Sequence, residues 1–272
     1  MDICRAAENS IIKKYRRSIW RPFIKALQDY KLIQDGDRIA ACVSGGKDSM
    51  LMAKCLQELK RYSHTKFELV FLTMDPGYSA ETRLAVEQNA ELLRIPITIF
   101  NTDIFDTAAK SDEGMCYICA RMRRGHLYKK AREMGCNKIA LAHHFDDVIE
   151  TTLLSMFYGG EIKTMLPKLH SKNYAGMELI RPLYLMREAS VTAWQNHHGL
   201  SFIRCACRMH EHGAPDSGVD SKRREIKQLL KSLRLQNPII EKNIFKSMEN
   251  VNADAVIGYK HNNERRSFLD SY

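Results

Sequence analysis

Short apolar stretches alternate with longer amphipathic ones through the first 160 residues of the chain. The short stretches are typical of buried strands, and the longer ones repeat their apolar side chains with the period of a helix. We therefore expect strands at 39–43, 67–74, 96–102 and 138–144, and helices at 49–62, 81–95, 119–135 and 146–160. This alternation is typical of α/β proteins, so the sequence predicts a parallel sheet with helices on both faces.

Helical patterns flank this region. The N-terminal arm carries one apolar stripe, but Pro22 should break or kink it, so two shorter helices are expected there. Residues 165–186 have the pattern of two extended segments around a polar turn. Further helices are expected at 187–199, 222–236 and 239–252. The expected parts are an N-terminal helical arm at 1–35, a strand-and-helix domain at 36–190 and a C-terminal helical region at 191–272.

A polar loop lies between the first strand and the first helix of the alternating region. It offers two glycines, two hydroxyls, a lysine and an acid: Ser44, Gly45, Gly46, Lys47, Asp48 and Ser49. Ligands of an open parallel sheet bind beyond the carboxyl ends of its strands, and a helix N-terminus favours an anion. The spacing is not that of the common P-loop. We expect a phosphate site, with Asp48 directed to Mg²⁺ or to the helix N-terminus; the alternative is an ordinary capped turn.

The chain is basic. Its 42 Lys and Arg outnumber its 32 Asp and Glu, which gives a net charge of +10. Such a surface attracts polyanions, so nucleic acid is a candidate partner. We find no apolar run long enough to span a bilayer and no signal peptide in the first residues, so we expect a cytoplasmic protein without a membrane partner.

Four of the eight cysteines form two close pairs. Cys116 and Cys119 make a C-x-x-C motif at the start of a basic helix, and Cys205 and Cys207 make a distant C-x-C motif. In a reducing compartment such pairs indicate metal or redox chemistry. Their spacing leaves open a redox pair, a zinc site and no function at all. Two further cysteines have the apolar neighbours of core residues: Cys42 and Cys55.

The loop sequence Ser-Gly-Gly-Lys-Asp-Ser resembles that of the PP-loop ATP pyrophosphatases, which adenylate a substrate and release pyrophosphate. Four stretches narrow the resemblance to the tRNA 2-thiocytidine synthetases: DGDRIAACVSGGKDS at 35–49, LAHHFDDVIETTLLSMFYGG at 141–160, MLPKL at 165–169 and IRPLYL at 180–185. The resemblance covers most of the chain. It implies a PP-loop fold and an ATP-dependent tRNA sulfurtransferase. That enzyme forms 2-thiocytidine at position 32 of the anticodon loop through adenylation of the pyrimidine C2 oxygen.

The resemblance also implies the residues of the ATP site. Catalytic roles are implied for Lys47, Asp48 and Asp147, the last as a contact to Mg²⁺ or to the ribose side. The implied ATP-binding residues are Ser44, Gly45, Gly46, Lys47, Asp48, Ser49, Met74, His143 and Asp147, with Asp75 beside Met74 at the adenine. A helix cap at Asp146 and a solvated position for Glu150 are equally good explanations of the neighbouring acids. One of the adjacent His143 and His144 should face the core.

In thiolases of this class, a C-x-x-C motif and one distant cysteine hold a [4Fe–4S] cluster through three thiolates, which leaves one iron open to carry sulfide. The implied ligands are Cys116, Cys119 and Cys207. Cys205 is the alternative third ligand, because C-A-C stands where the class has C-x-x-C. The implied cofactors are ATP, Mg²⁺ and the [4Fe–4S] cluster.

The basic helix that follows the C-x-x-C motif would lie beside this cluster, which favours contacts to tRNA phosphates over a plain solvated face. The expected RNA-binding residues are Arg121, Arg123, Arg124, Lys129, Lys130 and Arg181. The other expected partners are a sulfur donor, such as a cysteine desulfurase, and a second copy of the chain in a homodimer.

Three alternatives stay open. A tRNA 2-thiouridine synthetase of the same superfamily would usually carry zinc-binding cysteine pairs at both chain ends, which this sequence lacks. A small-molecule ligase would use the loop for ATP and the cysteines for zinc. A non-catalytic iron–sulfur sensor would bind nucleic acid without ATP, and the phosphate loop argues against it.

Overall fold

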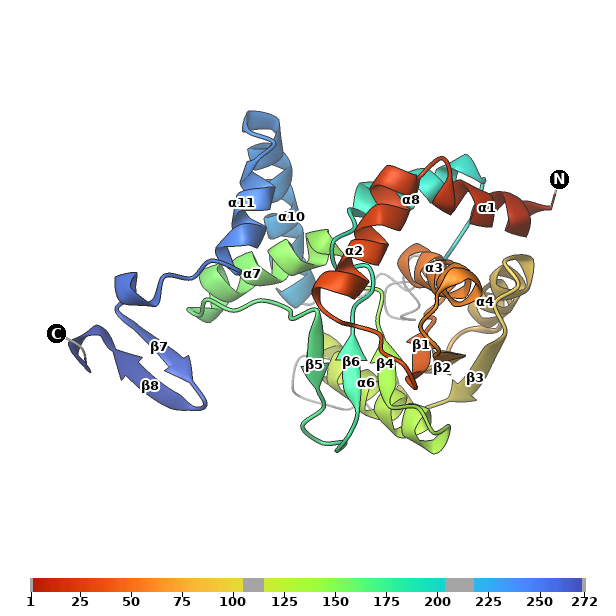
Figure 1. Ribbon diagram of the computed structural model, residues 1–272, viewed down its shortest axis with the longest axis horizontal. Helices are drawn as coiled ribbons and strands as arrows, with labels where there is room; N and C mark the ends of the chain where they lie inside the picture. The colour runs from red at the N-terminus through yellow and green to blue at the C-terminus, as the bar shows by residue number, and fades with distance from the viewer. Residues whose placement is uncertain (1, 105–114, 204–217, 271–272) are drawn as a thin grey trace. The chain divides into compact units, whose positions relative to one another are not determined.

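The computed structural model describes residues 2–104, 115–203 and 218–270, and their main feature is a six-stranded sheet (Figure 1). Its strands, in spatial order, are β3 (Ile97–Asn101), β2 (Glu68–Asp75), β1 (Arg38–Cys42), β4 (Lys138–Ala140), β6 (Glu178–Ile180) and β5 (Lys168–His170). The helices around it are α1 (Ile3–Ile12), α2 (Arg21–Asp29), α3 (Lys47–Tyr62), α4 (Ala80–Leu92), α6 (Met115–Glu133) and α8 (Glu188–His197), and α7 (Phe145–Gly159) begins in the chain segment after β4. The predicted α/β fold is confirmed.

The order of the strands reverses at β1. From β1 the chain runs through α3 to β2 and through α4 to β3, and it then crosses back through α6 to β4 on the other side of β1. β1 pairs in parallel with both neighbours. Ligands of parallel sheets bind at such a reversal, beyond the carboxyl ends of the two strands concerned. Those ends are Cys42 and Ala140.

Helices cover both faces of the sheet. Cys42 of β1 belongs to a buried cluster with Leu127 and Ala131 of α6. Because side chains alternate along a strand, Ala41 faces the opposite side. Figure 1 shows α3 and α4 on that side and α6 on the other. The first strand is therefore buried from both faces, which explains why its sequence is an unbroken apolar run.

The N-terminal arm forms two α-helices as predicted, but the break is not at Pro22. α1 ends at Ile12, and a π-helix at Arg16–Trp20 leads directly into α2. Pro22 lies in the first turn of α2. A proline there removes no helical hydrogen bond, so it starts the second helix instead of breaking one.

The sheet differs from the prediction at the end of β4, whereas the two extended segments expected in 165–186 pair with each other as β5 and β6. β4 ends at Ala140, and residues 141–144, which we expected to continue it, leave the sheet as a loop. β5 runs antiparallel to β6, whereas all other pairs in this sheet are parallel. The short connection at 171–177 is the reason, because parallel neighbours need a much longer crossover.

Residues 149–164 and 223–272 form a second compact unit, and the first unit consists of 1–148 and 165–222. The second unit holds most of α10 (Gly218–Gln236), α11 (Ile240–Ser247) and the hairpin of β7 (Gly258–His261) and β8 (Glu264–Ser267). The division at residues 35 and 190 stays a prediction. None of the described helices has the length and hydropathy needed to cross a bilayer.

The β7–β8 hairpin was not predicted. Its turn residues, Asn262 and Asn263, both have left-handed backbone angles, with φ of 50° and 66°. Two such residues in succession are what a tight type I′ hairpin turn requires, and asparagine tolerates this conformation. The flanking strands are mostly polar and exposed, so they lack the apolar alternation by which strands are found in a sequence.

Candidate active site

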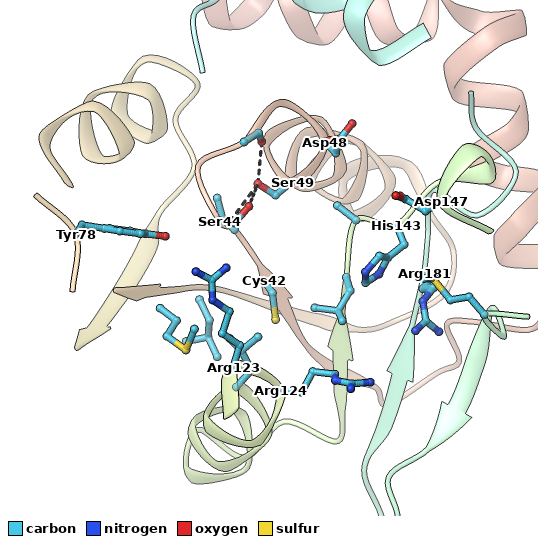
Figure 2. A pocket seen from close by; sticks show the side chains of 18 residues that line it. Cys42, Ser44, Asp48, Ser49, Tyr78, Arg123, Arg124, His143, Asp147 and Arg181 are labelled. Atoms are coloured by element: carbon cyan, nitrogen blue, oxygen red, sulfur yellow. Dashed lines mark hydrogen bonds between the residues drawn. The ribbon is translucent and has the colours of Figure 1, made fainter. Parts of the chain in front are cut away.

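A cavity of about 470 Å³ lies at the carboxyl ends of β1, β2 and β4 (Figure 2). The phosphate loop and the start of α3 form one part of its wall, and α6 and the loop after β4 form others. Met74, at the end of β2, adds an apolar wall. The charged and polar side chains that line the cavity are Ser44, Asp48, Ser49, Tyr78, Arg123, Arg124, His143, Asp147 and Arg181.

Ser49 organises the phosphate loop. Its Oγ accepts a hydrogen bond from the backbone N–H of Ser44 at 3.1 Å and donates one to the carbonyl of Gly46 at 2.9 Å. Gly46 is the N-cap residue of α3, and no side chain among the described residues caps the helix there. The N–H groups of the first turn and the positive end of the helix dipole therefore meet at the cavity, which suits a phosphate group.

Gly45 can be no other residue without strain. Its φ is +85°, and a Cβ at this position would lie 2.6 Å from Val86 Cγ2 and 2.8 Å from Ile203 Cδ1. Gly46 differs, because its φ is −80° and a Cβ there would meet its nearest neighbour at 3.6 Å.

We expect Gly45→Ala to destabilise the protein by about 1–2 kcal/mol through the left-handed backbone, with about 1–3 kcal/mol more from overpacking. Gly46→Ala is the matched control and should leave the melting temperature nearly unchanged. Thermal unfolding of the two variants checks this. Equal melting temperatures would contradict the constraint on Gly45.

Lys47 is held between two carboxylates. Its Nζ lies 3.0 Å from Asp48 Oδ2 and 3.0 Å from Glu188 Oε1 at the start of α8. Burial opposes the charged form, but the two carboxylates outweigh it and raise the pKa of Lys47. Lys47 is therefore a fixed cation beside the loop, and Glu188 ties α8 to it.

The two adjacent histidines separate as expected. His144 is buried, with 4% of its surface exposed, whereas His143 lines the cavity. Asp147 accepts a hydrogen bond from the backbone N–H of His144 at 3.0 Å, so Asp147, three residues into α7, helps to cap this helix. The cap that we had considered for Asp146 is thus made by Asp147. Asp146 instead accepts the backbone N–H of Glu188 at 2.7 Å.

Arg181 is an arginine in a desolvated position. It is 6% exposed, its Nη1 donates to the carbonyl of Leu166, and its buried Nε has no hydrogen-bond partner within the described parts of the chain. Burial lowers the pKa of Arg181 to about 10, and the charge of Arg124 acts in the same direction. Figure 2 shows Arg123 and Arg124 in the same cavity. Three guanidinium groups at one cavity favour a ligand that carries several negative charges.

The comparison with known families agrees with this geometry. The family described as the PP-loop domain matches residues 16–207, which include the loop, β1 to β6 and α8. The chain belongs to the PP-loop family. Residues 44–49 are its PP-loop, and the family membership predicted from the sequence is confirmed.

Three curated relatives carry the name tRNA-cytidine(32) 2-sulfurtransferase. The protein of Citrifermentans bemidjiense is 35% identical over 84% of this chain and 88% of its own length. The protein of Geobacter sulfurreducens is 34% identical over 90% of this chain and 92% of its own length. The protein of Pelobacter propionicus is 37% identical over 84% of this chain and 83% of its own length. The resemblance to the tRNA 2-thiocytidine synthetases is therefore confirmed over most of the chain.

A solved structure shares the PP-loop fold. It is the U34-tRNA thiolase NcsA from Methanococcus maripaludis with its [4Fe–4S] cluster. The TM-score is 0.65 at 20% identity, over 88% of this chain and 81% of that chain. This likeness supports the fold.

Other expected site residues lie away from the PP-loop cavity or outside the described parts. Lys129 and Lys130 follow along α6 but do not line the cavity, and Lys130 pairs with Glu133 at 3.2 Å. Asp75 accepts the backbone N–H groups of Gly77 and Tyr78 and shapes the turn after β2. Three expected site residues lie in α6, but their side chains are not described: Cys116, Cys119 and Arg121. Two others, Cys205 and Cys207, lie outside the described residues.

The sequence interpretation missed Tyr78 and Glu188. Tyr78 lines the PP-loop cavity from the turn after β2, and Glu188 holds Lys47. The position of Tyr78 directly after a strand, at the ligand-binding end of the sheet, was the available signal. Glu188 had none, because its contact joins residues 141 positions apart in sequence.

Proposed function

We propose that this PP-loop protein is an ATP-dependent tRNA sulfurtransferase that forms 2-thiocytidine at position 32. The relatives that carry this name align with most of the chain. The observation that carries the proposal is the cavity in which the PP-loop, Asp147 and the guanidinium groups of Arg123, Arg124 and Arg181 meet. It combines a site for pyrophosphate with cations for a polyanionic substrate.

In the first step the cytidine O2 attacks the α-phosphorus of ATP and pyrophosphate leaves. The N–H groups at the start of α3 and the hydroxyls of Ser44 and Ser49 would hold the pyrophosphate, and Lys47 would offset its growing charge. Donors that are aimed at developing charge before the reaction account for much of the catalysis in such sites. Met74 and Tyr78 would enclose the adenosine, since they line the same cavity.

The carboxylates of Asp48 and Asp147 suit Mg²⁺. Both line the cavity, and hard cations prefer carboxylate oxygen ligands. Bound there, Mg²⁺ would neutralise charge on the departing pyrophosphate. Asp147 also caps α7, which fixes the position of its carboxylate.

In the second step sulfur replaces the oxygen at C2, and that oxygen leaves with AMP. The proposed ligands of a [4Fe–4S] cluster are Cys116, Cys119 and Cys207, with Cys205 as the alternative to the third. Cys116 and Cys119 fall in the first turns of α6, three residues apart, and a basic segment of the same helix reaches the cavity. The cluster would supply the sulfur. A cysteine desulfurase as donor, a homodimer and a cytoplasmic location belong to the same proposal.

The proposed RNA-binding residues are Arg121, Arg123, Arg124, Lys129, Lys130 and Arg181. The structure divides them into a group at the cavity and a group outside it. Arg123 and Arg124 line the cavity, so they would contact both ATP and the target nucleotide. Lys129 and Lys130, farther along α6, would contact only the tRNA backbone.

We expect charge reversal of Arg123 and Arg124 to weaken the binding of both ATP and tRNA. Reversal of Lys129 and Lys130 should weaken only tRNA binding. It should also flatten the dependence of that binding on salt, because a variant that contacts fewer phosphates releases fewer counterions when it binds. Titration of both ligands at several salt concentrations separates the two pairs. An unchanged salt slope in the lysine variant would show that Lys129 and Lys130 face solvent and do not contact tRNA.

Mass spectrometry of tRNA nucleosides from a deletion strain tests the function itself. Loss of 2-thiocytidine, restored by the intact gene, is the expected result. An unchanged nucleoside profile would refute the proposal. Loss of 2-thiouridine instead would assign the chain to the related class of synthetases.

A further inference from the structure

The β7–β8 hairpin contains a pair of like charges. Its register places Lys260 of β7 directly opposite Arg265 of β8. Like charges in this position destabilise a sheet, and a hairpin of two strands has little stability of its own. Within the described ranges neither side chain forms an ion pair, whereas the neighbouring Arg266 pairs with Glu264 at 3.1 Å. The pair therefore costs stability, which the attraction between Lys260 and Glu161 of the same unit, without a direct ion pair, offsets only in part.

The face that carries these two cations is open. Because side chains alternate along a strand, Gly258 and Ser267 share this face with Lys260 and Arg265. Both are small, so their side chains do not cover the two charges. Gly258 also sets how closely the strands approach, because a Cβ there would lie 2.7 Å from the carbonyl oxygen of Arg266. Seven of the eight strand residues are exposed.

We propose that this face of the hairpin binds the phosphate backbone of RNA through Lys260 and Arg265. Two neighbouring cations on an exposed face can bind neighbouring phosphate oxygens. The negative phosphates would then offset the repulsion between the two cations. The proposal rests on the proposed function, because tRNA is the RNA in question. It adds a contact in the second unit of the chain to those expected on α6.

A second copy of the chain fits this face less well. In a two-fold symmetric dimer the same surfaces meet, so four cations from two hairpins would be brought together. Interfaces between protein chains also exclude charged residues from their centre. Charge complementarity thus favours a polyanion over another hairpin.

Lys260→Glu separates binding from folding. Opposite Arg265 the new carboxylate forms a favourable cross-strand pair, which offsets the lost attraction to Glu161, so the hairpin should stay folded. RNA binding should nevertheless weaken, by about five- to tenfold, since an exposed ion pair is worth up to about 1 kcal/mol and the variant adds repulsion. The slope of log affinity against log salt should fall by about 1. Affinity for ATP should not change.

Lys242→Glu is the matched control, since Lys242 is an exposed lysine on α11 in the same unit. It should change tRNA affinity less than Lys260→Glu does. Unchanged or improved tRNA binding by Lys260→Glu would overturn the proposal, because that is the result of a purely structural role. A change in sedimentation from dimer to monomer would also overturn it and would assign the hairpin to contact between copies.

The two proposals fail in different ways. If the wild-type protein thiolates tRNA and Lys260→Glu has the same tRNA affinity and salt slope, only the role of the hairpin is refuted. If the wild-type protein shows no salt-dependent affinity for tRNA, both the hairpin contact and the proposed function fall.

Discussion

Replacement of Asp48 by alanine should lower the rate of tRNA thiolation by about a hundred- to a thousandfold, the usual loss when one group that stabilises transition-state charge is removed. Asp48 lines the cavity at the first turn of α3, next to Lys47. The fold should survive, because Glu188 still holds Lys47 at 3.0 Å. Ser44→Ala should act in the same direction, since Ser44 contributes a hydroxyl to the same loop.

Single-turnover thiolation with saturating ATP measures this effect apart from binding. Asp29→Ala is a suitable control, because Asp29 is an exposed acid that pairs with Lys25 on α2. Its turnover should equal that of the wild type. Wild-type turnover in Asp48→Ala as well would remove Asp48 from the adenylation step.

Alanine at Cys116 or Cys119 should abolish both the iron content and the thiolation activity. Only three thiolates are proposed to hold the cluster, so the loss of any one leaves a second iron without a protein ligand. Protein purified without oxygen should be brown and hold about four irons per chain, as a [4Fe–4S] centre requires. Cys207→Ala should behave in the same way, whereas Cys205→Ala should keep the cluster.

Cys55→Ala is the control for this series. Cys55 is fully buried in α3, and burial raises the pKa of its thiol, so it is an inert core residue. It should lose only packing. Loss of iron in Cys205→Ala but not in Cys207→Ala would reverse the choice of third ligand. Zinc in place of iron, even after reconstitution without oxygen, would remove the sulfur-carrying role of these cysteines.

The sequence predicts those parts of the fold in which local pattern and burial agree. β1 is buried on both faces, so its apolar run identified it directly. The PP-loop was predicted from the residue types that a phosphate requires after such a strand. β4 was predicted too long, because Leu141 and Ala142 are apolar as strand residues are, yet they line the cavity. Apolar character shows that a residue avoids water, and it does not show which structure encloses it.

The parts that were not predicted depend on distant contacts or on polar surfaces. The hairpin has no apolar face, and only its Asn-Asn turn gave a local signal. The residue types of His143 and His144 did not separate them, and only the family resemblance pointed to His143, which lines the cavity. Arg181 was expected to bind RNA, but its burial was not predicted, because it follows from the packing of the segment after β6.

The buried contact between Lys54 and Glu8 limits how this protein can be recombined with its relatives. Lys54 is fully buried in the helix that begins at the PP-loop, and Glu8 of α1 lies 2.6 Å from it. Burial opposes the ionisation of Glu8, but Arg61 and Lys54 lower its pKa to about 2. A lysine left there without its carboxylate would cost about 3–5 kcal/mol. A chimera whose first helix comes from another protein can therefore keep this ATP site only if that helix brings an acid to position 8.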